Sequence, residues 1–201
     1  MKYMKHNSFT IIYVPGLGAQ NDTIRRFALR LWSLIGRVDV IFVQMKWRDP
    51  NEQYENKRDR IIQAIQQVAS QHSVVLVGES AGGAMTMALL RSFPHKIHTV
   101  VTLCGKNQHA SRVSSAIYRQ NPAFHDAMTA ADNAVTHFSH EERTRIITFY
   151  SPYDTVVPPK DSLIDGATHK AILFPGHIPT VVYLLFLRFP LIIASIKHHR
   201  L

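Results

Sequence analysis

The chain has 201 residues, a length that suits one domain with a substantial hydrophobic core. Hydrophobic residues make up 46% of it and charged residues 18%, which are values of a globular protein. Its single cysteine, Cys104, excludes an internal disulfide, and its net charge of +9 makes nucleic acid and anionic membranes partners to consider.

The basic residues are scattered along the chain rather than clustered with aromatic ones, and no nucleic-acid recognition module is present. We therefore expect no nucleic-acid partner, although a basic nucleic-acid binder stays an alternative that predicts steep salt dependence. Lys2 and Lys5 precede an apolar run, but this run, residues 9–14, is short for a signal peptide and ends in Pro15. It is better interpreted as the first strand, and a cytoplasmic location is the expectation.

Short apolar runs rich in β-branched residues alternate along the chain with segments of helical periodicity. Such strands are typical of a parallel sheet with helices on both faces, which predicts an α/β fold. There is no internal repeat, linker or low-complexity tract, so we predict one domain over residues 1–201. Six strands are expected, at residues 8–14, 38–43, 74–77, 97–103, 145–150 and 170–174.

The first predicted helix begins near Asn21 and ends at Gly36, a residue suited to a helix C-terminus. A second amphipathic helix covers residues 52–69, a third follows Ser80 and ends near Phe93, and a long apolar helix closes the chain. Shorter helical runs are expected at residues 110–119, 122–137 and 159–165. The apolar stripe of the first helix consists of Ile24, Phe27, Leu31, Leu34 and Ile35.

The stretch 74–83 is the most informative. Four apolar residues predict a buried strand, residues 78–82 fit G-x-S-x-G with Ser80 at the centre, and strong helix formers follow. A strand, a tight turn with a serine at its tip and a helix together form the context of a nucleophile elbow. Gly78 and Gly82 suit this turn because strand and helix nearly touch there. The alternative is an ordinary strand-to-helix turn whose glycines allow close packing.

Two further local matches lie just beyond the ends of predicted strands. Ser151-Pro152-Tyr153-Asp154 follows the fifth strand and Pro175-Gly176-His177 follows the sixth. In the order serine, acid, histidine, the three matches make the chain resemble a compact α/β-hydrolase of the serine esterase or lipase type over nearly its whole length. The resemblance implies six mostly parallel strands where the full family fold has eight, and catalysis without a cofactor or metal.

The resemblance assigns a role to each residue of a catalytic triad. Ser80 would be the nucleophile, His177 the base that activates it and then the acid that protonates the leaving group, and Asp154 the group that orients the imidazole. His169 is a rival for His177 but precedes the last strand. Asp161 and Asp165 are rivals for Asp154 and lie further from the strand end.

An oxyanion hole needs backbone N–H donors. The family pattern implies one from Ala81, which follows the nucleophile, and one from the glycine-rich loop after the first strand. Leu17 is the predicted second donor. Gly16 beside it is expected to border the bound substrate.

Residues 105–143 fall where the family commonly inserts a cap, and about forty residues suffice for a small one. Tyr118, Phe124 and Met128 within it are predicted to line an acyl pocket, with helix packing as the alternative.

The last 21 residues contain Arg188, Lys197 and Arg200 but no acid, and residues 181–187 are all apolar. Two interpretations stay open: the last helix of the fold packing on the sheet, or a helix that docks on a membrane with Lys197 and Arg200 at the headgroups. Pro190 would kink any helix there.

The predicted function is hydrolysis of carboxylic esters, with a small-molecule ester or a lipid as substrate. Thioester and amide bonds yield to the same machinery, and a non-catalytic binding protein on a hydrolase fold is the alternative from another class.

Overall fold

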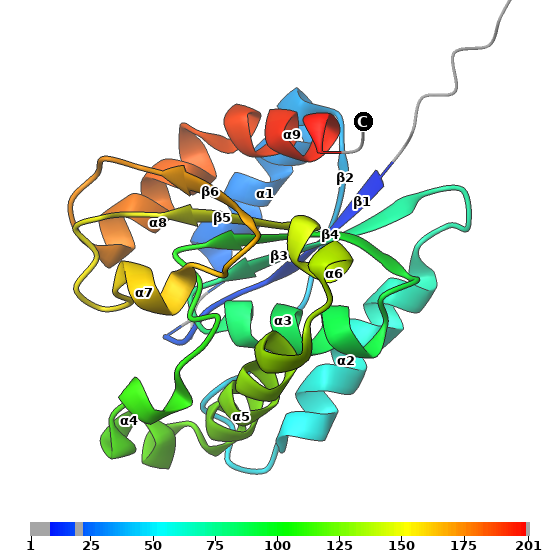
Figure 1. The fold of residues 1–201 in the computed structure, drawn as a ribbon. Helices are drawn as coiled ribbons and strands as arrows, with labels where there is room; N and C mark the ends of the chain where they lie inside the picture. Colours follow the sequence, from blue (N-terminus) through cyan, green and yellow to red (C-terminus); the bar gives the residue numbers. More distant parts are fainter. Residues whose placement is uncertain (1–8, 19–21, 200–201) are drawn as a thin grey trace, which may run out of the picture.

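The computed structural model describes residues 9–18 and 22–199, so the predictions that involve Ser8, Asn21 and Arg200 fall outside it. Figure 1 shows one central sheet with helices above and below it. All six strands are parallel, in the spatial order β2-β1-β3-β4-β5-β6. The strands are β1 (Phe9–Val14), β2 (Asp39–Phe42), β3 (Ser73–Glu79), β4 (Ile97–Leu103), β5 (Ile146–Tyr150) and β6 (Thr168–Ala171).

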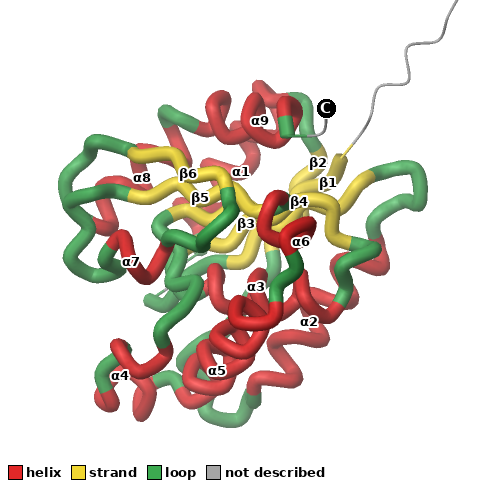
Figure 2. Tube along the Cα trace, in the orientation of Figure 1, coloured by secondary structure: helices red, strands yellow, loops and turns green. Residues whose placement is uncertain are grey.

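The helices form two layers, which Figure 2 shows in red on either side of the yellow sheet. One layer contains α1 (Thr23–Gly36), α8 (His177–Phe186) and α9 (Phe189–His198). The other contains α2 (Tyr54–Gln67), α3 (Gly82–Ser92) and α5 (Pro122–His137). The short elements are η1 (Ala110–Arg112), α4 (Ser115–Gln120), α6 (His140–Thr144) and α7 (Pro159–Ser162).

The strands β1, β3, β4 and β5 are buried on both faces because successive side chains enter opposite cores. In β1, Ile11 and Tyr13 pack under α1 and α9, whereas Ile12 and Val14 pack under α2 and α3. This double burial explains why the central strands read as continuous apolar runs in the sequence. The prediction of a parallel, doubly covered sheet is confirmed.

The edge strand β6 differs from its prediction. It was expected at residues 170–174 and instead covers Thr168–Ala171, which are mostly exposed polar residues. An edge strand pairs on one side only and has little buried surface, so apolar runs do not mark it. The chain turns away after Ile172, and Leu173 is exposed.

The segment 105–143 is mostly a crossover between β4 and β5 rather than a cap. Its long helix α5 packs along α3 and also contacts α2, so it belongs to the layer below the sheet. The short elements η1 and α4 also contact α5. The segment therefore packs mainly on the helices below the sheet.

The predicted long C-terminal helix is two helices. They are bent by 72° at Leu187 and Arg188, just before Pro190. Among the described residues no single helix is long and apolar enough to cross a bilayer, and α8 and α9 reach that length and composition only as a bent pair. The buried residues of α9 are Phe189, Ile192, Ile193, Ser195 and Ile196, which favours the packing interpretation for this helix.

Candidate active site

Ser80 stands at the turn between β3 and α3 in a left-handed conformation, with φ of +49°. A residue with a Cβ adopts this conformation at a cost, which the surroundings must offset. Here the N–H of Ser80 donates to the carbonyl of Leu103 at 3.0 Å, and its own carbonyl accepts from Gly83 at 2.9 Å and Lys106 at 2.8 Å. Three backbone hydrogen bonds therefore hold the serine on a strained turn at the carboxyl ends of the strands.

The small residues around Ser80 are sterically required. A Cβ added to Gly82 would lie 2.1 Å from the carbonyl oxygen of Val14, and one on Gly78 would lie 2.8 Å from the oxygen of Gly82. A Cβ on Gly16 would lie 2.7 Å from the Cβ of Ser80. The loop after β1 thus passes directly against the serine, as the elbow geometry demands.

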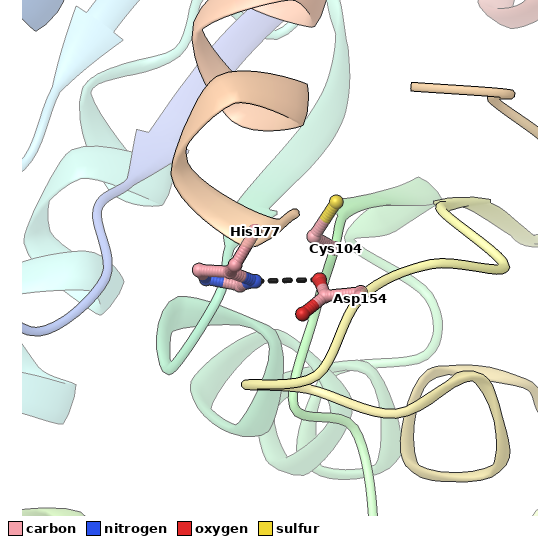
Figure 3. Close-up of side chains that lie close together, drawn as sticks. All are labelled: Cys104, Asp154 and His177. Atoms are coloured by element: carbon pink, nitrogen blue, oxygen red, sulfur yellow. Dashed lines mark hydrogen bonds and ion pairs between the residues drawn. The ribbon is translucent and has the colours of Figure 1, made fainter. Parts of the chain in front are cut away.

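His177 joins the serine to an aspartate. Its Nε2 lies 2.9 Å from Ser80 Oγ, and its Nδ1 lies 2.6 Å from Asp154 Oδ2 (Figure 3). Because a carboxylate only accepts, Nδ1 carries the proton and Nε2 is left to accept from the serine hydroxyl. His177 is the first residue of α8, and Asp154 lies in the loop after β5, so two separate elements bring the pair to Ser80.

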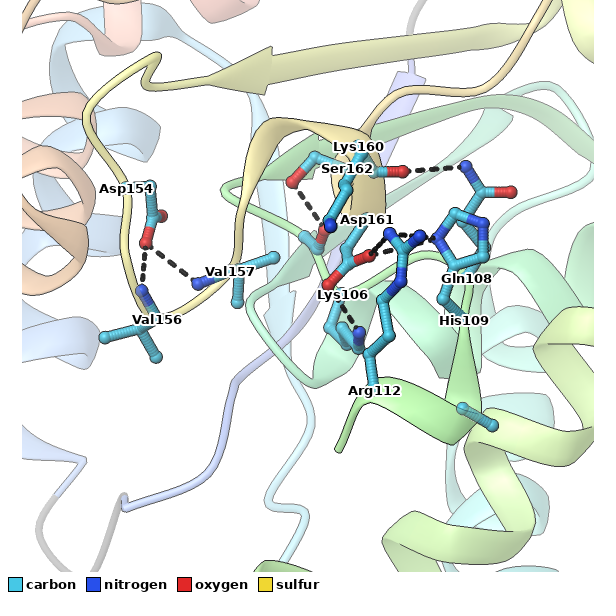
Figure 4. Close-up of polar contacts among 12 residues, drawn as sticks. Lys106, Gln108, His109, Arg112, Asp154, Val156, Val157, Lys160, Asp161 and Ser162 are labelled. Atoms are coloured by element: carbon cyan, nitrogen blue, oxygen red, sulfur yellow. Dashed lines mark hydrogen bonds and ion pairs between the residues drawn. The ribbon is translucent and has the colours of Figure 1, made fainter. Parts of the chain in front are cut away.

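Asp154 is held in place by the backbone of its own loop. Its Oδ1 accepts N–H groups from Val156 and Val157, both at 2.9 Å (Figure 4). One carboxylate oxygen is therefore fixed by the loop while the other faces the histidine. Asp154 is 4% exposed and His177 9%, so their interaction takes place largely out of water.

The rival residues lie elsewhere. Asp161 binds Lys106 at 2.7 Å and Arg112 at 2.9 Å (Figure 4), and Asp165 is exposed. His169 Nε2 lies 2.9 Å from the carbonyl oxygen of Ile164. Of the acids and histidines that compete in the sequence, the structure brings only Asp154 and His177 to Ser80.

Cys104 lies behind the aspartate and histidine. Its sulfur and one ligand atom each of Asp154 and His177 are within 4.8 Å of one another (Figure 3). Burial, and next the charge of Asp154, raise the pKa of the Cys104 thiol, so it stays protonated. Both ring nitrogens of His177 already have partners, Ser80 and Asp154. Cys104 is therefore interpreted as a buried neighbour of this hydrogen-bonded chain rather than as a metal ligand.

The two predicted oxyanion donors flank the serine. Ala81 follows it at the start of α3, and Leu17 lies in the loop that touches it through Gly16. Neither backbone N–H donates a hydrogen bond to any part of the chain that the structure describes. The loop is tied down by Trp47, whose Nε1 donates to the carbonyl of Pro15 at 2.9 Å. The role of the Ala81 and Leu17 backbone N–H groups as oxyanion donors stays a prediction.

The three predicted pocket residues lie in packed positions. Phe124 is 3% exposed and contacts the rings of Trp47 and Tyr118, each with centroids 5.8 Å away. Met128 is fully buried, and the hydroxyl of Tyr118 donates to the carbonyl of Ala110. Because α5 turns its apolar face toward α3, Phe124 and Met128 fill the core, and Tyr118 on α4 is half-buried against it, which matches the packing alternative.

A buried ion pair beside the elbow was not predicted from the sequence. Glu79 is 3% exposed and forms a bidentate pair with Arg25, at 2.5 and 2.6 Å, and accepts a hydrogen bond from Tyr13. Burial, and then the charge of Glu79, raise the pKa of Tyr13 well above its ordinary value. An acid between an apolar strand and a buried turn signals that a partner exists, but the partner is 54 residues away in the chain.

The comparisons with known proteins identify the family and the fold of the chain. A family model described as the alpha/beta hydrolase fold matches residues 46–166, more than half of the chain, including Ser80 and Asp154. The chain belongs to the alpha/beta hydrolase family. No curated protein sequence matches this hydrolase significantly.

Solved structures of other hydrolases share its fold. An alpha/beta hydrolase enzyme from the metagenome of Mar Chica lagoon sediments superposes with a TM-score of 0.67 at 14% identity, covering 96% of this chain and 93% of that one. A structure reported with LipS and LipT, metagenome-derived lipolytic enzymes, gives 0.65 at 14% identity over 96% and 94%. The monoacylglycerol lipase of Paleococcus ferrophilus gives 0.61 at 15% identity over 94% of each chain. At these identities the likeness concerns the fold.

Proposed function

We propose that this alpha/beta hydrolase is a serine hydrolase that cleaves carboxylic esters through an acyl-enzyme intermediate. The observation that carries the proposal is the unbroken hydrogen-bonded chain from Ser80 Oγ through His177 to Asp154. An unassisted serine hydroxyl is a weak nucleophile, and a neutral imidazole with a free Nε2 acceptor is the base it needs. Esterases and lipases among the structural neighbours support an ester as the bond attacked.

The reaction follows from the positions of these groups. Ser80 Oγ attacks the carbonyl carbon while His177 Nε2 takes its proton, and Asp154 stabilises the imidazolium through Nδ1. In this proposal the backbone N–H groups of Ala81 and Leu17 donate to the negative oxygen that forms. His177 then gives its proton to the departing alcohol as the C–O bond breaks, which leaves an acyl group on Ser80. Water attacks that acyl group with the same proton transfers, releases the acid and restores the serine.

A fluorophosphonate probe tests the nucleophile directly. We expect the wild-type protein to be labelled and Ser80→Ala to be unlabelled, while Ser70→Ala, a change at an exposed serine outside the site, is labelled like wild type. Turnover of a soluble short-chain ester should fall by about 10⁴-fold or more in Ser80→Ala and His177→Ala, and by about 10⁴-fold in Asp154→Asn.

Two results would contradict the proposal. One is equal labelling of wild type and Ser80→Ala; the other is a folded wild-type protein without turnover on esters of increasing acyl length, which would favour a non-catalytic binding protein. Faster turnover of thioesters or amides than of matched esters would leave Ser80 as the nucleophile but change the class of bond that we propose it attacks.

A further inference from the structure

The apolar stripe of α1 faces solvent. Ala28, Leu29 and Trp32 are the residues of α1 that pack on the sheet, and the stripe that marks this helix in the sequence lies on another side. Leu34 is 76% exposed, Ile24 65% and Phe27 55%, and Ile35 is exposed as well. A helix that repeats at 3.6 residues places positions 24, 27, 31, 34 and 35 along one line, so these side chains form one continuous ridge.

The exposed side of α8 continues this ridge toward the active site. Ile178, Val182 and Phe186 follow one another at four-residue intervals, so they share one face of α8. The ring of Phe186 contacts that of Phe27 on α1, with centroids 6.2 Å apart, and Ile178 directly follows His177. We call the apolar side chains on the outer sides of α1 and α8 the α1–α8 surface. It consists of Ile24, Phe27, Leu31, Leu34, Ile35, Ile178, Val182 and Phe186.

Three arginines border this surface. Arg26 and Arg30 lie along one side of α1, Arg37 directly follows the helix, and none of the three forms an ion pair within the described residues. The Arg26 guanidinium lies over the ring of Phe42 on β2, 4.4 Å from its centroid. Arg26 and Arg30 line a hollow of about 470 Å³ between α1 and the edge strand β2, together with Leu34. The helix α1 contains no Asp or Glu, and no acid occurs anywhere after Asp165.

We infer that the α1–α8 surface docks on a lipid bilayer that carries anionic headgroups. An exposed apolar ridge flanked by arginines, on a protein of net charge +9, is the arrangement by which interfacial helices bind such membranes. Arginine rows facing each other across a dimer would repel, so a second copy of this chain fits the charge less well. Docking by this surface places the start of α8, and thus His177, next to the lipid.

This location differs in part from the membrane contact that the sequence left open, which involved the C-terminal helix as a whole. Residues 191–196 of α9 supply buried core residues, so a membrane contact there would require α9 to leave the fold. The ridge on α1 needs no such rearrangement, because its side chains are already in solvent. The docking does not depend on hydrolysis, so it can hold or fail independently of the proposed function.

The test is flotation of the full chain with vesicles of phosphatidylglycerol and phosphatidylcholine, compared with vesicles of phosphatidylcholine alone. We expect binding to the anionic vesicles that weakens at high salt, and unchanged binding by Ser80→Ala. The double variant Phe27→Ser/Leu34→Ser should bind these vesicles at least about ten-fold more weakly than wild type. The control Ile117→Ser, at an exposed apolar residue on α4, should bind like wild type. Arg30→Gln/Arg37→Gln should also bind more weakly than Lys96→Gln/Arg119→Gln, which removes the same charge elsewhere.

Circular dichroism and turnover of a soluble short-chain ester verify that the ridge variants are folded. No flotation of wild type with anionic vesicles would overturn the inference. Equal loss in the ridge and control variants would overturn it too. A wild-type dimer by light scattering that becomes monomeric in Phe27→Ser/Leu34→Ser, without vesicle binding, would assign the surface to self-association instead.

Discussion

The two faces of the sheet are covered by helices of different chemistry. On the side of α2, α3 and α5, cations have acidic partners: Glu52 binds the buried Lys57 and the partly exposed Arg60, and Glu142 binds Arg91. On the side of α1, α8 and α9, the helices contain no acid, and exposed arginines border an exposed apolar ridge. The difference teaches that both layers cover the sheet, but the second also presents apolar side chains and arginines to solvent with no acid on its helices.

The largest effect is expected in the core of the α1 face. Trp32 is fully buried, stacks on Phe189 and donates from Nε1 to the carbonyl of Leu185 at 2.7 Å. Trp32→Ala should lower the free energy of unfolding by about 3–5 kcal/mol, because a cavity and an unpaired carbonyl remain. Urea denaturation measures it, and Trp32→Phe, which keeps most of the packing, should cost clearly less. A loss below about 1 kcal/mol would show that α1 contributes little to the fold.

The next effect concerns the buried ion pair between Arg25 and Glu79. Glu79→Gln should cost about 2–4 kcal/mol of unfolding free energy, because Arg25 keeps its charge without a carboxylate. The double variant Arg25→Met/Glu79→Gln should cost less than the sum of its two single changes. Strict additivity in denaturation experiments would contradict direct coupling of the two residues.

On the side of α2, the stabilisation that Glu52 provides should depend on pH. Burial alone would raise the pKa of Glu52, but the hydrogen bond and charge of Arg60, together with Lys57, lower it to about 2. Because the folded pKa is the lower one, the stabilisation is present above the ordinary value of 4.5 and is lost as pH falls through about 2.

At pH 7, Glu52→Gln should therefore be less stable than wild type by about 1–3 kcal/mol, and the difference should vanish as pH falls from about 4.5 to about 2. Thermal unfolding as a function of pH measures this. Glu55→Gln, at an exposed residue in the first turn of α2, three positions after Glu52, is the control and should change little. A gap between wild type and Glu52→Gln that stays constant with pH would be inconsistent with the low pKa.

The smallest effect should come from the ridge. Leu34→Ser on α1 should change the free energy of unfolding by less than about 0.5 kcal/mol, because Leu34 already lies in water. Leu89→Ser on α3 removes the same side chain from a 1% exposed site and should cost at least about 3 kcal/mol. A large loss for Leu34→Ser would show that the ridge helps to hold the fold.

Sequence predicted the sheet well where burial on both sides leaves an apolar run. Residues 97–103 match β4 at both ends. The bounds of a strand are predicted less accurately where its burial is partial, as in β6. The orientation of α1 was not predictable, because the helix has two apolar sides and only the folded neighbours decide that Trp32 rather than Leu34 packs inward.

The candidate site shows the same division. Ser80, Asp154 and His177 each stand in a local context that the chain displays by itself, at or within a few residues of the end of a strand. The pairing of Glu79 with Arg25 depends on two segments meeting in space. Likewise, the burial of Phe124 depends on α5 lying on α3, and apolar residues at helical spacing look the same in a pocket as in a core.

The position of Cys104 provides an internal reporter of opening motions. It is the only cysteine of the chain, it is fully buried, and it lies at the end of β4 against the aspartate and histidine of the candidate site. A thiol reagent can reach it only when the centre of the sheet separates from α8 or the loop after β5. Labelling kinetics at this one atom therefore follow how often the site comes apart, without any introduced probe.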